Sequence, residues 1–281
     1  NVLLIAALGA VLLGTLYPLV VDALGLGKIS VGPPYFNAVF VPLIAPALFL
    51  MGLGPLARWK NGRPADVAAR LKWPFAAALG IGLALAFALG EFRPWAALGF
   101  FLAAWIAYTV GLAFRDRLRG GGWRALPRAF WGMQLAHFGM AVGVAGIAVV
   151  AAYSSERDVR MAPGGSAELA GYTFVFRGVE PREGPNFRAM RGTVEVGRNG
   201  ARVATLHPEK RVYAASGMAM TEASVHPNLF RDVYVALGEP LDDQGAWSVR
   251  LFHKPFINWL WLGALLMAAG GLLAATDPRY R

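Results

Sequence analysis

Cysteine is absent from all 281 residues. The chain therefore cannot itself carry out thiol–disulfide exchange, thiolate nucleophilic catalysis or metal binding by thiolates. Its sequence also has no nucleophile constellation, no internal repeat and no low-complexity tract. Acidic residues are few, because 17 Asp and Glu stand against 27 Lys and Arg, which leaves a formal net charge of +10. Any catalytic role must therefore depend on something other than a familiar side-chain nucleophile.

Apolar residues dominate the composition. They make up 56% of the chain, the mean hydropathy is +0.46, and several apolar runs reach the length of about 20 residues that crosses a bilayer. These features predict a polytopic α-helical membrane protein. We expect about six spans, at residues 2–24, 35–56, 74–89, 95–114, 129–153 and 255–276.

The positive charge is concentrated in two short loops, 57–73 and 115–128. Each loop is net +4, because five basic residues stand against one aspartate. Their charged residues are Arg58, Lys60, Arg63, Asp66, Arg70 and Lys72 in the first loop, and Arg115, Asp116, Arg117, Arg119, Arg124 and Arg128 in the second. Short basic loops stay in the cytoplasm, and anionic lipid headgroups are their expected partners. Counting spans from there predicts that residues 154–253 lie on the external side.

The segment 154–253 is the part of the chain that reads as an aqueous domain. It has twelve basic and twelve acidic residues, so it lacks the basic face that nucleic-acid binding requires. Runs rich in β-branched and aromatic residues lie at 172–177, 191–196, 202–206, 231–237 and 247–252. Gly184-Pro185 and Asn199-Gly200 are turn signals between such runs. We expect an antiparallel β domain, a sandwich or barrel, between the last two spans, with domains at 1–153, 154–253 and 254–281.

A single histidine, His137, lies in the span 129–153. On a helical wheel it points about 140° from a stripe of small residues, which comprises Gly132, Ala136, Gly139, Gly143 and Gly146. The stripe suits close approach of a neighbouring helix. His137 instead faces Phe130, Met133, Ala141, Val144 and Ala148, so its own helix is expected to offer its ring nitrogens little.

Ionisable residues at membrane depth are usually functional, and three interpretations of His137 remain open. The imidazole could bond across a helix interface, serve a proton relay or transport path, or ligate a haem iron. A relay usually needs several ionisable groups, and besides His137 the apolar spans hold only Asp22, at the end of the span 2–24. The remaining histidines, His207, His226 and His253, show no ligand spacing in the β segment, so we expect surface, edge or turn positions for them.

Five segments together resemble the C-terminal part of the CcmF family, the haem lyase subunits of cytochrome c maturation, and of the related CycK and NrfE proteins. They read LGTLYPL at 13–19, KISVGPPYFN at 28–37, QLAHFGMAV at 134–142, RDVYVALGEP at 231–240 and KPFINWLWLG at 254–263. The resemblance runs from one end of the chain to the other.

The resemblance implies a multi-pass protein of the bacterial inner membrane with 154–253 in the periplasm. Such a lyase attaches haem through thioether bonds to the CXXCH thiols of apocytochrome c. Its implied partners are the haem chaperone CcmE, CcmH/CcmI-type subunits that hold apocytochrome c, and the N-terminal part of the same protein. Family members also hold a b-type haem between two intramembrane histidines. His137 matches the more C-terminal of that pair and would be an axial ligand, with the second ligand outside this chain.

The chain departs from the family pattern in what it lacks. The tryptophan-rich WWD motif, the two external histidines and the other intramembrane histidine are expected upstream of the matched region, and none is present. The chain begins at Asn1 within an apolar span, which favours part of a longer or split protein. We therefore expect no catalytic residue in this chain. The alternatives are a membrane transporter of haem or another small molecule, and a non-catalytic scaffold for cytochrome assembly.

Overall fold

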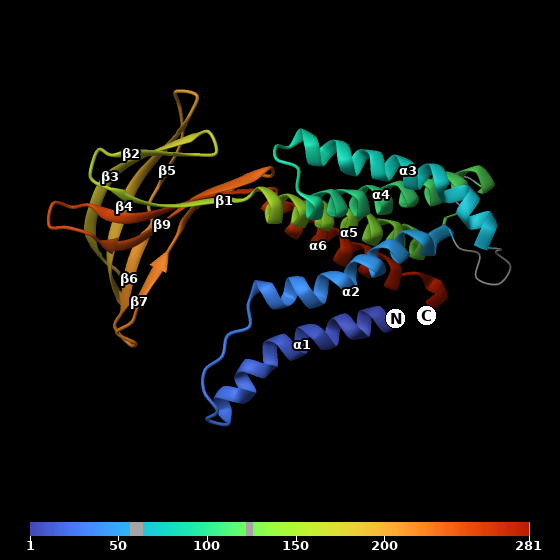
Figure 1. The fold of residues 1–281 in the computed structure, drawn as a ribbon, viewed down its shortest axis with the longest axis horizontal. Coiled ribbons are helices and arrows are strands. Elements are labelled where there is room, and N and C mark those ends of the chain that lie inside the picture. Colours follow the sequence, from blue (N-terminus) through green and yellow to red (C-terminus); the bar gives the residue numbers. More distant parts are fainter. Residues whose placement is uncertain (57–63, 122–125, 281) are drawn as a thin grey trace. The chain divides into compact units, whose positions relative to one another are not determined.

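The computed structural model describes residues 1–56, 64–121 and 126–280. It contains the predicted classes of element in the predicted order, with helices first, a β domain after the fifth helix and a sixth helix last (Figure 1). The chain divides into two compact units. One comprises 1–145 and 262–281, and the other comprises 146–261.

Six helices of the described part of the chain are long and apolar enough to cross a membrane. They are α1 (Val2–Ala23), α2 (Pro33–Leu53), α3 (Pro64–Ala88), α4 (Pro94–Gly121), α5 (Arg128–Tyr153) and α6 (Ile257–Ala275). The expected start of the third span at residue 74 was wrong, because α3 begins at Pro64 and its apolar segment is Ala68–Ala88. Pro74 lies inside this helix, where membrane helices tolerate proline.

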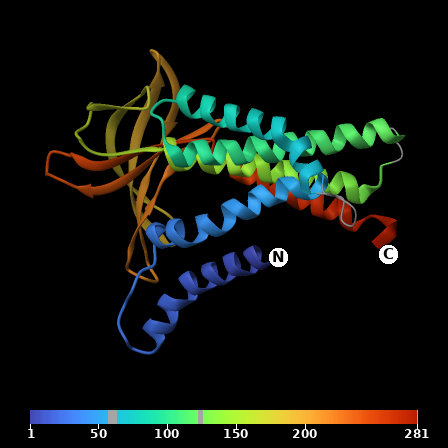
Figure 2. The same cartoon turned by 45° about the vertical axis from the view of Figure 1, so that its right-hand side comes forward.

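Close contacts at glycine and tryptophan join α2, α3 and α4. A Cβ on Gly82 of α3 would lie 2.8 Å from the Phe101 backbone nitrogen of α4, and Figure 2 shows these helices side by side. The Trp105 indole donates to the Phe49 carbonyl of α2 at 2.9 Å. Its ring also stacks on Phe49 at 5.2 Å. These three helices therefore meet around one aromatic cluster.

The structure describes some of the charged residues of the two basic loops, from which the orientation in the membrane is predicted. Arg70 of α3 forms an ion pair with Asp116 of α4. The side chains of Arg58, Lys60, Arg63, Asp66 and Arg124 lie outside the described residues. The orientation itself remains a prediction.

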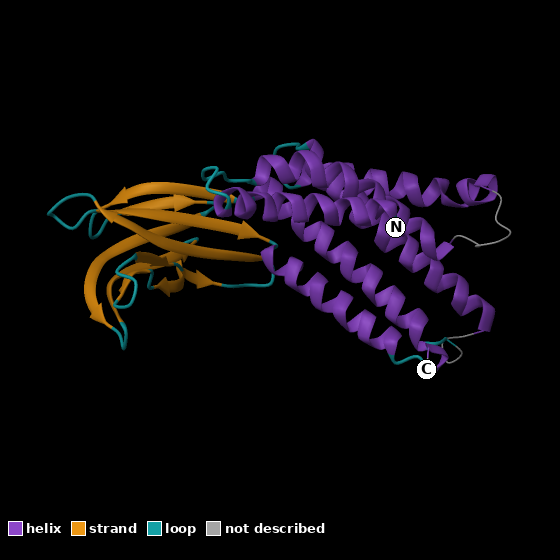
Figure 3. Ribbon diagram, turned by 90° about the horizontal axis from the view of Figure 1, so that it is seen from below, coloured by secondary structure: helices purple, strands orange, loops and turns teal. Residues whose placement is uncertain are grey.

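The β domain consists of two antiparallel sheets, shown in orange in Figure 3. The four-stranded sheet has the order β1-β10-β9-β8, and the larger sheet has the order β2-β3-β4-β6-β7 with β5 also paired to β4. The strands are β1 (Ser155–Met161), β2 (Ser166–Leu169), β3 (Tyr172–Glu183), β4 (Phe187–Arg198), β5 (Ala201–Leu206), β6 (Glu209–Tyr213), β7 (Ala219–Glu222), β8 (Ser224–His226), β9 (Arg231–Pro240) and β10 (Trp247–Pro255).

Both predicted turns lie between paired strands. Gly184-Pro185 separates β3 from β4, and Asn199-Gly200 separates β4 from β5. Asn199 and Gly200 have φ values of 51° and 78°, the left-handed geometry that favours Asn-Gly at a hairpin tip. All five predicted strand runs lie in strands.

Alternating residues of both sheets form the domain core. On each strand, every second side chain points between the sheets. The members of this core on the four longest strands are Tyr172, Phe174 and Phe176 on β3, Val194 and Val196 on β4, Val233, Val235 and Leu237 on β9, and Trp247, Val249 and Leu251 on β10. The domain is therefore a sandwich with one continuous apolar core.

Candidate functional site

The imidazole of His137 is half-buried on α5 and is oriented by its own helix. Nδ1 lies 2.8 Å from the carbonyl oxygen of Met133, one turn earlier. A carbonyl only accepts, so Nδ1 carries a proton, and in the neutral ring Nε2 then keeps its lone pair. The expectation that this helix offers the ring little was therefore wrong. No second hydrogen bond of this ring occurs within the described residues, so the ring has no interhelical bond there.

A different face of α5 packs against α6, as the small-residue stripe predicts. A Cβ on Gly139 would lie 2.8 Å from the Gly263 carbonyl oxygen, and one on Gly146 would lie 2.9 Å from the Trp259 Cβ. The contact is reciprocal, because a Cβ on Gly263 would lie 2.7 Å from the Gly139 carbonyl oxygen. Gly143 has more room, because a Cβ on this residue would lie no closer than 4.0 Å to its nearest neighbour, the Gly263 Cα. The two backbones therefore touch along this stripe.

Gln134 attaches a further face of α5 to α4. Its side chain is 5% exposed, and Nε2 donates to the Val110 carbonyl at 2.9 Å. The Gln134 Oε1 atom is buried and accepts no bond from the described residues. Contacts with α4 and α6 thus fix the rotation of α5, and with it the direction of His137.

Asp277 fixes the position of α5 along the axis of α6. Its Oδ2 atom accepts from the Ala129 backbone N–H in the first turn of α5 at 2.7 Å. Hydrogen bonds from Arg279 and from the Ala129 backbone N–H hold the pKa of the Asp277 carboxyl well below its ordinary value. A carboxylate at a helix N-terminus is also favoured by the helix dipole. This contact joins the end of α6 to the start of α5.

The other three histidines lie in or beside strands of the β domain. His207 follows β5 and lies 3.3 Å from the Thr193 hydroxyl. His226 ends β8, and His253 lies on β10 with a buried Nδ1 that has no partner among the described residues. No group of three residues suited to holding a metal ion occurs in the described part of the chain.

One polar cluster in the β domain was not anticipated. It comprises Tyr172, Arg198, Arg231 and His253, which each end an inward-facing row of a different strand. The signal was present in the sequence as alternating apolar runs that finish in a polar residue. Only the pairing of the sheets shows that these ends meet.

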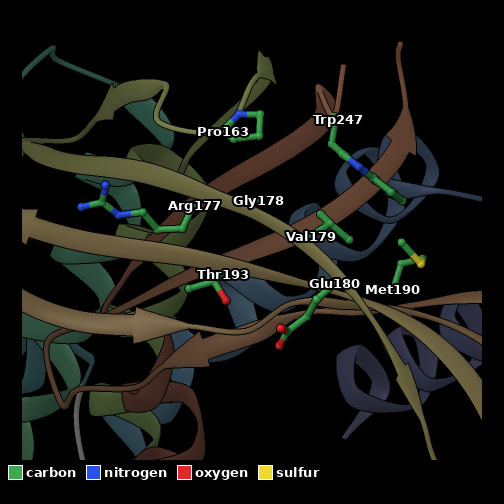
Figure 4. Close-up of a pocket in the computed structure, with 9 residues that line it drawn as sticks. Pro163, Arg177, Gly178, Val179, Glu180, Met190, Thr193 and Trp247 are labelled. Carbon is green, nitrogen blue, oxygen red and sulfur yellow. The ribbon is translucent and has the colours of Figure 1, made fainter. Parts of the chain in front are cut away.

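An open pocket of the β domain is lined by residues of β3, β4 and β10 and of the turns beside them (Figure 4). It measures about 610 Å³ and is lined by Pro163, Arg177, Gly178, Val179, Glu180, Met190, Thr193, Gly245 and Trp247. Arg177 donates to Glu195 at 2.7 Å, and this hydrogen bond holds the pKa of the Glu195 carboxyl below its ordinary value. The hydroxyl of Thr193, another lining residue, lies 3.3 Å from the His207 Nδ1.

Fold and site together define a class, the polytopic helical membrane proteins with a β sandwich inserted between the last two membrane helices. Residues 152–255 match the family model described as the CcmF C-terminal beta-sandwich. The resemblance predicted from five segments is thus confirmed. From end to end, the chain corresponds to the C-terminal part of the CcmF family.

Relatives of the whole chain support this assignment. The cytochrome c-type biogenesis protein CcmF of Pseudomonas fluorescens is 48% identical over 100% of this chain and 43% of its own length. CcmF of Escherichia coli K12 is 45% identical over the same shares. A solved structure named cytochrome c heme lyase CcmF has a TM-score of 0.79 at 25% identity, over 98% of this chain and 44% of that chain. The chain thus spans less than half the length of these relatives.

Proposed function

We propose that this chain is the C-terminal part of a cytochrome c haem lyase and that His137 is an axial ligand of a b-type haem in the membrane. The observation that carries the proposal is the bond from the His137 Nδ1 to the Met133 carbonyl. It fixes the neutral tautomer whose Nε2 can bind iron. The names of the relatives, a cytochrome c-type biogenesis protein and a heme lyase, supply the reaction class.

The residues of α5 contribute positioning. The Met133 carbonyl holds the proton on Nδ1 and sets the plane of the ring, as outer-shell partners of ligating histidines do. Ala141 and Val144, on the same side of the helix as His137, are 4% and 7% exposed. They keep this side of the helix apolar. When bound, haem supplies one-electron chemistry at its iron.

A lyase of this kind can depend on alignment rather than on a side-chain nucleophile. The apocytochrome supplies the attacking thiols, so the protein needs to hold the reacting groups in register. This agrees with a chain that has no cysteine and no catalytic constellation. We place the second axial ligand and the WWD motif outside this chain, in the N-terminal part of the same protein.

The β domain, residues 154–253, is proposed to face the periplasm of a bacterial inner-membrane protein. Its surface would meet CcmE, CcmH/CcmI-type subunits and apocytochrome c carrying CXXCH. The open pocket around Trp247 and Met190 is the concave part of that surface.

The haem proposal is tested in the full-length protein by comparing His137→Ala with His226→Ala. We expect the first variant to lose the low-spin b-type absorption bands and the second to keep them. Imidazole added to His137→Ala should restore part of the low-spin spectrum, because it can occupy the vacated ligand position. Full haem content in His137→Ala would refute axial ligation.

The proposed orientation is tested with single cysteines, which are unambiguous because the chain has none. Ala201, beside the β4–β5 turn, and Arg119, near the end of α4, are both exposed. An impermeant maleimide should label Ala201→Cys from the periplasm, and should label Arg119→Cys only after the inner membrane is opened. The reverse pattern would overturn the topology.

A further inference from the structure

The polar cluster of Tyr172, Arg198, Arg231 and His253 closes one end of the sandwich core. Tyr172 and Arg198 come from the larger sheet, and Arg231 and His253 come from the smaller sheet. Each continues an inward-facing row by the period of two. In the register of the sheets, His253 pairs with Ser155, the first residue of β1, so the cluster lies where the chain enters from α5 and leaves for α6.

The tyrosine hydroxyl is the shared acceptor of the cluster. Arg231 Nε donates to it at 2.6 Å, and Arg198 Nη1 donates to it at 3.1 Å. Both guanidinium groups also lie over the Tyr172 ring, at 5.2 and 4.9 Å from its centroid. The His253 ring lies 5.8 Å from the same centroid. Four polar groups from two sheets are therefore gathered at one point.

The two arginines of this cluster lack a counter-charge. No described carboxylate forms an ion pair with Arg198 or Arg231, whereas Arg177 and Arg250 on the same domain pair with Glu195 and Asp158. Two like charges that share one neutral acceptor are costly without an anion. Arg231 Nη1 also donates to the His226 carbonyl at 3.4 Å, and the other N–H donors of the two guanidinium groups are available to such an anion.

His253 adds a buried polar atom without a partner. Its Nδ1 has none among the described residues. Burial, with the charges of Arg231 and Arg198, lowers the pKa of the His253 imidazole below its ordinary value. The neutral ring can place its proton on Nδ1 and donate. The guanidinium N–H groups and this imidazole N–H are donors that an oxyanion can accept.

The surroundings indicate which oxyanion. Leu229 and Phe230, directly before Arg231, are 52% and 56% exposed. The Phe230 ring contacts Phe256 at 5.9 Å, and Phe256 contacts Trp259 in the first turn of α6 at 4.7 Å. Exposed apolar residues and aromatics at the start of a membrane helix are typical of the level of the headgroups.

We propose that Arg198, Arg231, Tyr172 and His253 bind the phosphate group of a phospholipid at the end of the β domain where α6 begins. Guanidinium forks match phosphate oxygens. The lipid supplies the counter-charge that this end of the domain lacks. Leu229 and Phe230 contact its acyl region.

The test measures lipids retained by the full-length protein. The protein is reconstituted in nanodiscs of phosphatidylglycerol and phosphatidylcholine, released into the gas phase and analysed by native mass spectrometry. Arg198→Gln/Arg231→Gln is compared with Arg177→Gln/Arg250→Gln, which removes the same charge from the same domain. The cluster variant should lose retained phosphatidylglycerol about tenfold or more, and the control should match wild type. Equal retention in both double variants would overturn the proposal.

Two further arms separate the source of the phosphate and guard against misfolding. Excess inorganic phosphate should leave the retained lipid in place. Displacement by phosphate, or phosphate binding without lipid retention, would instead assign a free-phosphate site and overturn the lipid source. If the double variant fails to fold, as judged by circular dichroism, Arg198→Gln alone serves, because Arg198 is exposed. This variant should still lose lipid relative to Arg177→Gln, and unchanged retention would count against the site.

Discussion

The α5–α6 pair and the β sandwich solve the packing problem in opposite ways. The two helices pack through glycines, which have no side chain, so that the backbones of Gly139 and Gly263 are in contact. The sandwich is held where side chains are largest, with Phe174 and Phe176 fully buried. Lipid tails provide no hydrophobic drive between helices, so close backbone approach matters there, whereas burial from water stabilises the sandwich. The helix pair has no room for a methyl group at Gly139, and the sandwich is destabilised by the loss of a ring.

The largest expected effect comes from removing a ring from the sandwich. Phe174→Ala should destabilise the β domain by about 3–5 kcal/mol, because it leaves a large cavity in a packed core. Thermal unfolding followed by near-ultraviolet circular dichroism measures this loss. Val225→Ala, at a position that is 47% exposed, is the control and should change little. Similar melting temperatures for both variants would show that the sandwich core is not the source of stability.

Adding a methyl group to the helix pair comes next. Gly139→Ala should cost about 1–3 kcal/mol through overpacking, because the new Cβ meets the Gly263 carbonyl and the Met267 backbone nitrogen at 2.8 Å. Gly143→Ala should be neutral or slightly stabilising, since its site is open to 4.0 Å and alanine favours the helix. Thermal denaturation in detergent compares the two. If Gly143→Ala is as harmful as Gly139→Ala, the helices approach each other differently.

Low pH should destabilise the β sandwich specifically, because the sandwich contains Glu209, which is only 4% exposed. Burial raises its pKa, but hydrogen bonds and charges from Arg211 and Arg182 outweigh this and lower it overall. A lowered pKa means that the carboxylate stabilises the fold above its ordinary pKa, and that this contribution is lost as pH falls through the folded-state value. In Glu209→Gln, the free energy of unfolding of the β domain should therefore fall less steeply with decreasing pH below about pH 4.5 than in the wild type. Glu180→Gln, at an exposed position, should keep the wild-type dependence of stability on pH. An equally steep loss of stability in Glu209→Gln would contradict this role of Glu209.

The smallest effect is expected at the junction that Asp277 makes between the two helices. Asp277→Asn keeps an acceptor for the Ala129 N–H but removes the negative charge from the start of α5 and from Arg279. The melting temperature in detergent should fall by less than in Gly139→Ala, and the fall should shrink in high salt, which screens the charge. A drop that is independent of salt would point to lost geometry instead.

The architecture was predictable because its signals are local. Apolar length gave the spans, alternation gave the five main strands, and Asn199-Gly200 gave a hairpin. The strand β1 was missed because its sequence SERDVRM is largely polar and it lies at the edge of its sheet. The start of α3 was missed because Pro74 resembles a helix start but lies within the helix.

The candidate site was predictable only in part. His137 stands out as an imidazole in an apolar span, but a helical wheel places side chains and omits the carbonyl of Met133 that orients the ring. The cluster at Tyr172 was hidden because its contacts join residues that are far apart in sequence. Arg231 is 59 residues from Tyr172, and only the facing of two sheets brings them together.

The pairing of Ser155 with His253 has a consequence for the modularity of the chain. The β domain enters and leaves through two neighbouring strands, so its ends are adjacent, as in domains that insert into hosts without disturbing them. The host is a hairpin of two helices in backbone contact. The domain can therefore be exchanged for that of a relative, or excised and replaced by a short turn between α5 and α6, while each part keeps its own packing. The surface of one part can change without redesign of the other.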